Sequence, residues 1–164
     1  MFTFNKNAIL TCAALAILAT PALAQSSLRD TPAEDFKFIP RQDTDKRLMT
    51  PAKGQTVASD VISDHENYYV LFAKRVDHGN ISEIHDHWVD HITILEGEGT
   101  LTYGGTLNGA KATAPGEWRG GTLADAKTQK LGPGDSFLVP AGMPHRLDPA
   151  SGQQLKYLVF KARR

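Results

Sequence analysis

Short apolar runs separated by glycine and proline are the feature that most constrains the fold of this chain. The runs are rich in Val, Ile, Thr, Tyr and Phe, and no window of a dozen residues within them has a helical period. Many short strands with frequent turns favour a sandwich or a barrel, so the sequence predicts an all-β fold. The expected strands lie within residues 56–63, 67–76, 81–87, 91–97, 99–105, 127–142 and 154–162.

The first 24 residues have the pattern of a secretory signal peptide. Lys6 supplies a positive charge, residues 8–19 form an apolar core, and Ala22 and Ala24 match the small residues that precede a cleavage site at Gln25. This apolar core is too short to span a bilayer, so no membrane contact is expected after cleavage. The predicted product is periplasmic or secreted.

The remaining residues exclude several kinds of chemistry. The only cysteine, Cys12, lies within the predicted signal peptide, so residues 25–164 contain no disulfide, thiolate ligand or cysteine nucleophile. The whole sequence has 18 basic and 18 acidic side chains, and removal of Lys6 leaves 17 basic ones, with no basic stripe. The sequence therefore predicts no nucleic-acid partner.

The chain is expected to divide into a signal peptide (1–24), an extended arm (25–53) and a barrel (54–164). The arm is polar and interrupted by proline, with a short strand expected near Phe36–Ile39. It is a candidate for exchange between the subunits of a homodimer. Residues 104–121 are rich in glycine and are expected to form a long connection at the mouth of a pocket.

Two stretches carry the residues that point to a function. Residues 83–99 read EIHDHWVDHITILEGEG, and residues 132–146 read GPGDSFLVPAGMPHR. In the second stretch Pro140 ends an expected strand, and Gly142 can adopt the positive φ of a sharp reversal. His145 follows this turn and begins the next strand.

Together these stretches resemble the two motifs of the cupin superfamily, and in particular small exported bacterial monocupins. The second motif, G-x5-P-x-G-x2-H-x3-N, departs from this sequence only at Pro149 and is matched at Gly134, Pro140, Gly142 and His145. The resemblance covers about residues 79–149. It implies a double-stranded β-helix (jelly-roll) barrel that holds a divalent metal through histidine and carboxylate side chains.

The first cupin motif, G-x5-H-x-H-x3/4-E-x6-G, fits this chain in two registers. The literal H-x-H is His85 and His87, followed by His91, which together with His145 would give a site of four histidines. In that register the closing glycine, Gly97, comes one residue early.

Counting back from Gly97 gives the second register. Asp90 then lies at the family distance for the acidic ligand, four residues separate it from His85, and Glu83 is the partner two residues before that histidine. Side chains two apart on a strand share a face, so Asp90 and His91 cannot both point inward without a bulge. This register gives Glu83, His85, Asp90 and His145, and the sequence leaves both registers open.

Imidazole and carboxylate ligands suit Fe, Mn, Zn or Ni. The resemblance implies an enzyme that acts on a small organic molecule as a dioxygenase, isomerase, decarboxylase or lyase, and the fold does not choose among these. Arg119 and Tyr103 are candidate pocket residues; the guanidinium of Arg119 suits a carboxylate but equally an ion pair with Glu117. The alternative function is a barrel without metal that binds a small ligand and does not turn it over.

Overall fold

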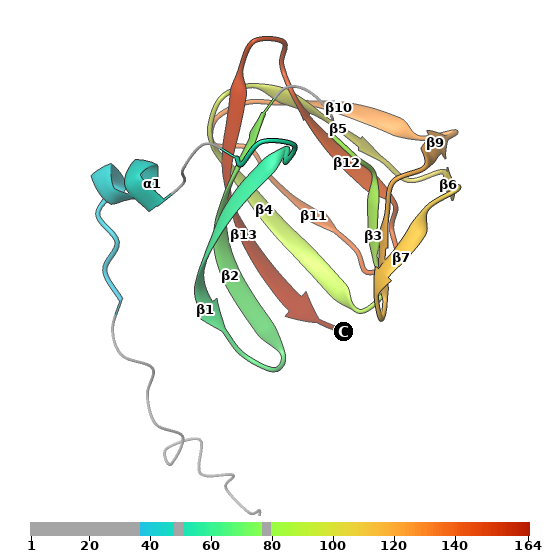
Figure 1. Ribbon diagram of the computed structural model, residues 1–164, viewed down its shortest axis with the longest axis horizontal. Coiled ribbons are helices and arrows are strands. Elements are labelled where there is room, and N and C mark those ends of the chain that lie inside the picture. The colour runs from blue at the N-terminus through green and yellow to red at the C-terminus, as the bar shows by residue number, and fades with distance from the viewer. Residues whose placement is uncertain (1–36, 48–50, 77–79) are drawn as a thin grey trace, which may run out of the picture. The chain divides into compact units, whose positions relative to one another are not determined.

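The structure is a computed structural model that describes residues 37–47, 51–76 and 80–164. The predicted signal peptide and residues 25–36 and 48–50 of the predicted arm lie outside the described residues. Within the described ranges one short helix precedes a series of strands, which form two facing sheets (Figure 1). The predicted all-β fold is confirmed. No helix in these ranges is long and apolar enough to cross a membrane.

The first sheet contains five antiparallel strands. Their order is β1 (Val57–Asp64), β2 (Tyr68–Val76), β13 (Gln154–Arg163), β4 (Trp88–Glu96) and β11 (Ser136–Val139). The last strand of the chain, β13, therefore lies at the centre of this sheet, between two strands that come much earlier in the sequence.

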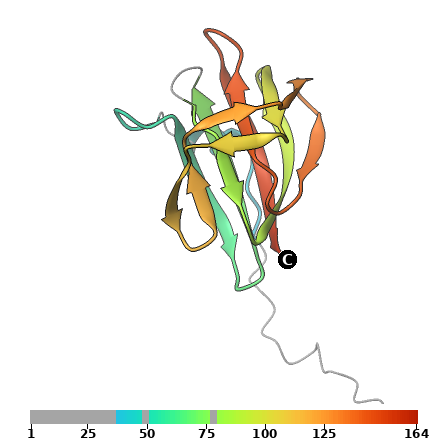
Figure 2. The same ribbon diagram turned by 90° about the vertical axis from the view of Figure 1, so that its right-hand side faces the viewer.

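The second sheet contains six strands, also antiparallel. Their order is β10 (Lys127–Leu131), β5 (Gly99–Tyr103), β12 (His145–Pro149), β3 (Glu83–His85), β8 (Glu117–Arg119) and β7 (Lys111–Ala114). A separate pair is formed by β6 (Thr106–Asn108) and β9 (Thr122–Ala124). Figure 2 looks onto the side of the barrel that these yellow and orange strands occupy.

The apolar core lies between the two sheets and follows the two-residue period of the strands. On β4 the buried side chains are Asp90, Ile92 and Ile94, whereas His91 and Leu95 are exposed. On β13 burial alternates in the same way from Leu155, which is fully buried, to Lys161. Charged residues therefore occur at inward positions at one end of strands that are otherwise apolar inside.

Residues 104–121, predicted from their glycine content to be a long connection between two strands, themselves contain strands. They contain β6, β7 and β8, and the glycines with positive φ lie between or beside these strands, for example Gly109 and Gly116. Glycine is needed here because tight turns require a backbone conformation that other residues adopt at a cost. The strand β8 pairs with β3 and so becomes part of the second sheet.

The predicted arm also needs correction where it is described. Residues 37–40 form no strand, and α1 (Arg41–Arg47) follows them. Asp43 lies in the first turn of this helix and Lys46 in the last, which is the favourable arrangement relative to the helix dipole, and the two side chains form an ion pair at 3.1 Å.

Replacement of Gly97 by alanine is expected to destabilise the barrel by roughly 1–3 kcal/mol, the usual cost of a non-glycine residue held in a strained backbone conformation. Gly97 has a φ of 84°, and an added Cβ would collide with the backbone carbonyl oxygen of Gln154. Gly54 is the matched control, because its φ is 83° but no atom lies within 4 Å of the added Cβ. Urea unfolding should therefore show a larger loss for Gly97→Ala than for Gly54→Ala; equal losses would contradict the role of the collision.

Candidate metal centre

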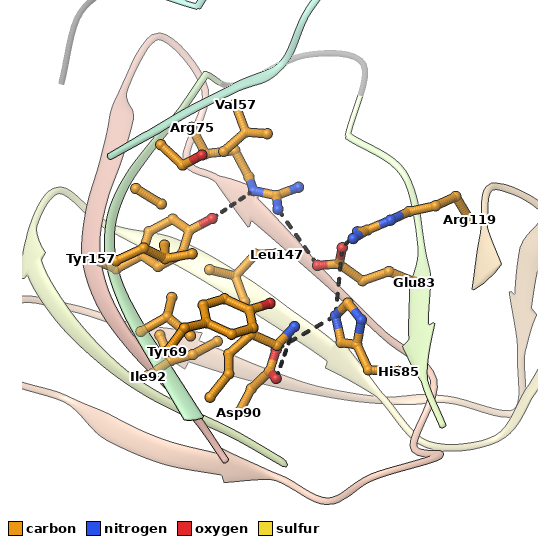
Figure 3. A pocket seen from close by; sticks show the side chains of 15 residues that line it. Val57, Tyr69, Arg75, Glu83, His85, Asp90, Ile92, Arg119, Leu147 and Tyr157 are labelled. Atoms are coloured by element: carbon orange, nitrogen blue, oxygen red, sulfur yellow. Dashed lines mark hydrogen bonds and ion pairs between the residues drawn. The ribbon is translucent and has the colours of Figure 1, made fainter. Parts of the chain in front are cut away.

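Four buried polar side chains meet at one end of the barrel interior. Glu83 and His85 share a face of β3, and His145 on β12 is paired with Glu83 across the sheet. Asp90 faces them from β4 of the other sheet. All four are less than a tenth exposed, and donor atoms of Glu83, His85 and His145 lie within 4.8 Å of one another. Figure 3 shows His85 directed toward Asp90, with Glu83 above it.

Both imidazoles direct the same nitrogen atom at the two carboxylates. The Nε2 atom of His85 lies 3.5 Å from Oδ2 of Asp90 and 3.9 Å from Oε2 of Glu83. The Nε2 atom of His145 lies 3.5 Å from Oε1 of Glu83 and 3.9 Å from Oδ2 of Asp90. Two nitrogen and two carboxylate donors therefore surround one small volume.

The other ring nitrogens select the tautomer of both histidines. Nδ1 of His145 donates a hydrogen bond to the carbonyl oxygen of Met143 at 3.1 Å, and Nδ1 of His85 lies 2.6 Å from Oε2 of Glu117. Since these oxygens accept hydrogen bonds, the proton of each neutral ring lies on Nδ1 and the lone pair on Nε2. Nε2 of His145 is buried and has no hydrogen-bond partner. This is the arrangement of metal-binding histidines, whose second nitrogen donates to a carboxylate or a carbonyl, so the residues fit a metal ion.

The turn of the second sequence motif is attached to the strand of the first. Gly142 has a φ of 79°, and its N–H donates to the carbonyl oxygen of His85 at 2.8 Å. The turn thus joins backbone positions on either side of the candidate site, and it leads directly into His145. Main-chain geometry thus holds together two sequence motifs whose histidines, His85 and His145, are 60 residues apart in the chain.

Three cations balance the acidic groups. The guanidinium of Arg119 contacts Glu83 and lies 3.4 Å from Glu117, and Arg75 lies 3.6 Å from Glu83. On the opposite side Nζ of Lys161 lies 3.0 Å from Oδ1 of Asp90. Figure 3 shows both guanidinium groups pointing toward Glu83. Buried carboxylates require such partners, because an unpaired buried charge is strongly unfavourable.

Burial dominates the proton affinities of this cluster. It lowers the pKa of His85 from 6.5 to about 2, with the positive charge of Lys161 as the second cause, and it lowers the pKa of His145. Burial also raises the pKa of Asp90 and lowers the pKa of Lys161. Both imidazoles are therefore neutral near pH 7, which is the form that binds a metal.

These shifts predict how acid affects the metal-free protein. An unfolded histidine takes up a proton below about pH 6.5, whereas His85 in the folded protein stays neutral down to about pH 2. The unfolded state then binds more protons, so the contribution of His85 to stability falls as the pH falls below 6.5. The raised pKa of Asp90 acts in the opposite direction, which makes a comparison with a variant necessary.

With a chelator present, the difference in the free energy of unfolding between the wild type and His85→Gln should decrease as the pH falls from about 7 to 5. Urea unfolding at several pH values measures it. A constant difference for His85→Gln would show that the ring is protonated in the folded state.

The cluster forms one end of a cavity of about 160 Å³. The polar end also includes Tyr69, whose pKa is raised by burial and by the negative charge of Asp90. The remainder of the wall contains Tyr157 and apolar side chains from both sheets, namely Val57, Leu71, Ala73, Ile92, Leu147 and Val159. The cavity is therefore polar at the candidate metal site and mainly apolar beyond it.

The other residues considered as ligands or pocket residues lie elsewhere. His91 is exposed on the outer face of β4, and His87 is exposed beside Gly116, so the structure does not bring these histidines together with His85 and His145. Tyr103 does not line this cavity but a separate groove of about 320 Å³ that also includes Phe137. Arg119 lines the cavity itself.

Sequence reasoning missed two members of the cluster, Arg75 and Lys161, whereas the ion pair that it offered between Arg119 and Glu117 is present at 3.4 Å. Arg75 and Lys161 occupy inward positions of β2 and β13, in phase with the buried Ala73 and Val159. A charged residue in phase with buried apolar ones was the available signal. The contact between Glu117 and His85 had no such signal, because residues 104–121 were expected to be a connection and not a strand paired with β3.

Comparisons with known proteins agree with the arrangement of strands. The sequence model of the AraC-like ligand binding domain matches residues 120–163. No curated protein sequence is significantly similar to this chain.

Among solved structures, an uncharacterised Klebsiella pneumoniae protein with a double-stranded β-helix domain has a TM-score of 0.53 and 18% identity, covering 73% of this chain and 85% of its own. KdgF from Halomonas has a TM-score of 0.51 and 14% identity, and the match covers 79% of this chain and 96% of KdgF. An oxalate oxidase in complex with glycolate has a TM-score of 0.53 and 11% identity, and the match covers 72% of this chain and 56% of the oxalate oxidase. The predicted double-stranded β-helix is thereby confirmed.

Proposed function

We propose that this chain, which has the barrel fold of the cupins, is an exported metalloenzyme that acts on a small organic molecule. Glu83, His85 and His145 would hold one divalent metal ion, with Asp90 as the fourth ligand. The observation that carries the proposal is the pair of neutral imidazoles whose Nε2 atoms converge on two buried carboxylates. The oxalate oxidase of the same fold, solved with glycolate, is a precedent for small-molecule chemistry.

The donor set suits Fe, Mn, Zn or Ni, because these ions accept imidazole nitrogen and carboxylate oxygen together. When bound, such an ion would supply Lewis acidity or an activated oxygen ligand next to the cavity. Glu117 would orient His85, and the carbonyl of Met143 would orient His145. The apolar walls of the cavity would exclude bulk water from the reacting molecule.

A second function is a barrel that binds a small ligand without metal. The ion pairs favour it, since Arg75, Arg119 and Lys161 already balance Glu83, Asp90 and Glu117 in charge. The match of residues 120–163 to an AraC-like ligand binding domain also favours it. The two functions differ in whether the purified protein takes up a metal ion.

Elemental analysis of protein purified without an affinity tag, stripped with a chelator and dialysed against each candidate metal, tests the proposal. One ion per chain and a raised melting temperature are the expected results, since a ligand that binds only the folded state stabilises it. Protein that stays metal-free under these conditions but binds small molecules would establish the second function instead. Assignment of the reaction class then requires turnover assays on the loaded protein.

A further inference from the structure

We propose that the molecule on which this site acts is a small carboxylate with a short apolar tail, whose negative group is held by Arg119 and Lys161. The inference rests on the proposed function, because it concerns the cavity beside the metal ligands. It follows from the net charge of the cluster, from the positions of Arg119 and Lys161 on the cavity wall, and from the mixture of polar and apolar side chains that line the cavity.

The charge balance of the cluster favours an anion. With every acidic and basic group ionised, the three carboxylates and the three cations cancel, and both histidines are neutral. A divalent ion adds two positive charges to a site that is largely shielded from water. Uncompensated charge is costly in such surroundings. An anionic ligand removes part of the surplus, whereas a neutral one does not.

The two arginines differ in how completely their guanidinium groups are paired with protein groups and buried. Arg75 is 6% exposed, and each of its guanidinium nitrogens has a partner: Tyr157 at 3.2 Å, Asn80 at 3.5 Å and Glu83 at 3.6 Å. Arg75 therefore holds Glu83 in place. The side chain of Arg119 is 34% exposed and lines the cavity.

Arg119 can hold its carboxylate partners and a ligand at once. Its contacts to Glu83 and Glu117 use the two terminal nitrogens, each of which carries two N–H groups. The second N–H of each can bind a ligand oxygen in the parallel geometry that guanidinium and carboxylate groups share. Of the three cations, Arg119 is therefore the one best placed to receive a ligand.

Lys161 supplies a second positive charge on the facing sheet. Its ammonium group lies 3.0 Å from Asp90 and 5.8 Å from the ring centroid of Tyr69, and it also lines the cavity. An ammonium group has three donors, so its contact with Asp90 leaves capacity for a ligand oxygen. The two cations thus approach the candidate metal site from opposite walls.

The rest of the cavity sets the size and polarity of the tail. A cavity of about 160 Å³ has room for about five water molecules, judged by the volume of each in the liquid. Its walls include Val57, Leu71, Ile92 and Leu147, which offer no hydrogen-bonding groups from their side chains, whereas Ser59 adds one hydroxyl group. The hydroxyl group of Tyr157 also lines the cavity and is already paired with Arg75 at 3.2 Å. A short aliphatic or small cyclic tail fits these walls; a tail with several hydroxyl groups, such as that of a sugar acid, would lose most of its hydrogen bonds to water.

Metal ion and carboxylate should strengthen each other's binding, because coupling between two ligands is reciprocal. Zn²⁺ affinity is measured by competition with a chromophoric chelator, alone and with butyrate, acetate or the neutral butyramide. Chelator-only titrations correct for butyrate bound to free Zn²⁺. Butyrate should tighten Zn²⁺ binding at least about fivefold, acetate less, and butyramide by less than about twofold. Arg119→Gln should reduce the butyrate effect, whereas Arg146→Gln should retain it; Arg146 pairs with Asp148 and lies outside the cavity.

The outcomes separate this inference from the proposed function. Protein that takes up none of Fe, Mn, Zn or Ni contradicts the proposed function, and the inference with it; if another of these ions binds and Zn²⁺ does not, the same titrations are made with that ion. Protein that takes up Zn²⁺ equally well with butyrate, butyramide or neither contradicts the inference alone. An effect of acetate as large as that of butyrate would refute the apolar tail. The wild-type comparison decides these points without relying on any variant.

Discussion

Replacement of His145 by alanine is expected to abolish metal binding, weakening it by more than the 10–100-fold that loss of a residue supporting a ligand typically costs. His145 is 1% exposed, and its unpartnered Nε2 atom faces both buried carboxylates. Removing it takes away one of two nitrogen donors, and no other histidine among the described residues belongs to the cluster. Chelator competition and elemental analysis measure the loss.

The matched control for this experiment is His91→Ala. His91 is exposed on the outer face of β4, one residue from the inward-facing Asp90. Metal affinity should therefore be unchanged in His91→Ala and greatly reduced in Asp90→Ala. Far-UV circular dichroism shows whether each variant folds, and His145→Gln repeats the test with less loss of volume. Loss of metal in His91→Ala with retention in Asp90→Ala would establish the four-histidine register instead.

Replacement of Lys161 by methionine is expected to destabilise the metal-free protein by about 3–5 kcal/mol, the usual cost of removing one partner of a buried ion pair. Lys161 and Asp90 are both largely buried, at 6% and 4% exposed, and methionine retains most of the apolar stem. Urea unfolding in the presence of a chelator measures the loss. Saturation with metal should restore part of it, because the ion would supply positive charge beside Asp90.

Lys156→Met, on the same strand, is the matched control. Lys156 forms ion pairs with Asp45 and Glu96, whose side chains are 62% and 44% exposed. Such surface pairs contribute less than about 1 kcal/mol, so the loss should be correspondingly small. The double variant Asp90→Asn, Lys161→Met should recover much of the stability lost in Lys161→Met. Equal losses in the free energy of unfolding for Lys161→Met and Lys156→Met would show that Lys161 does not compensate a buried negative charge on Asp90.

The strands and part of the cluster could be predicted because both depend on local pattern. Successive side chains of a strand alternate between two faces, so the sequence predicts that Asp90 and His91 point to opposite faces. The spacing from Gly97 in the cupin motif, which this chain resembles, points to Asp90, but the sequence alone left both registers open. His85 belongs to both registers, and the turn at Gly142 directs His145 in either. Their role as metal ligands stays a prediction.

The cations could not be derived in the same way, because their partners come from distant strands. Arg75 lies on β2 and reaches Glu83 on β3 of the other sheet. Lys161 is paired in register with Asp90, which depends on β13 lying next to β4 at the centre of the first sheet. Local pattern reports which face a residue occupies, but it does not report which strand becomes its neighbour.

The strand β8 shows how the pocket of this barrel can be altered without disturbing its interior. It brings Glu117 and Arg119 to the cluster, yet only the short strand β7 separates it from the sheet edge, and the exposed Trp118 lies between the two residues. Replacement of residues 115–121 alone would therefore change the side chains that β8 contributes to the pocket. The apolar core residues of the barrel, such as Ile94 and Leu155, would be left unchanged.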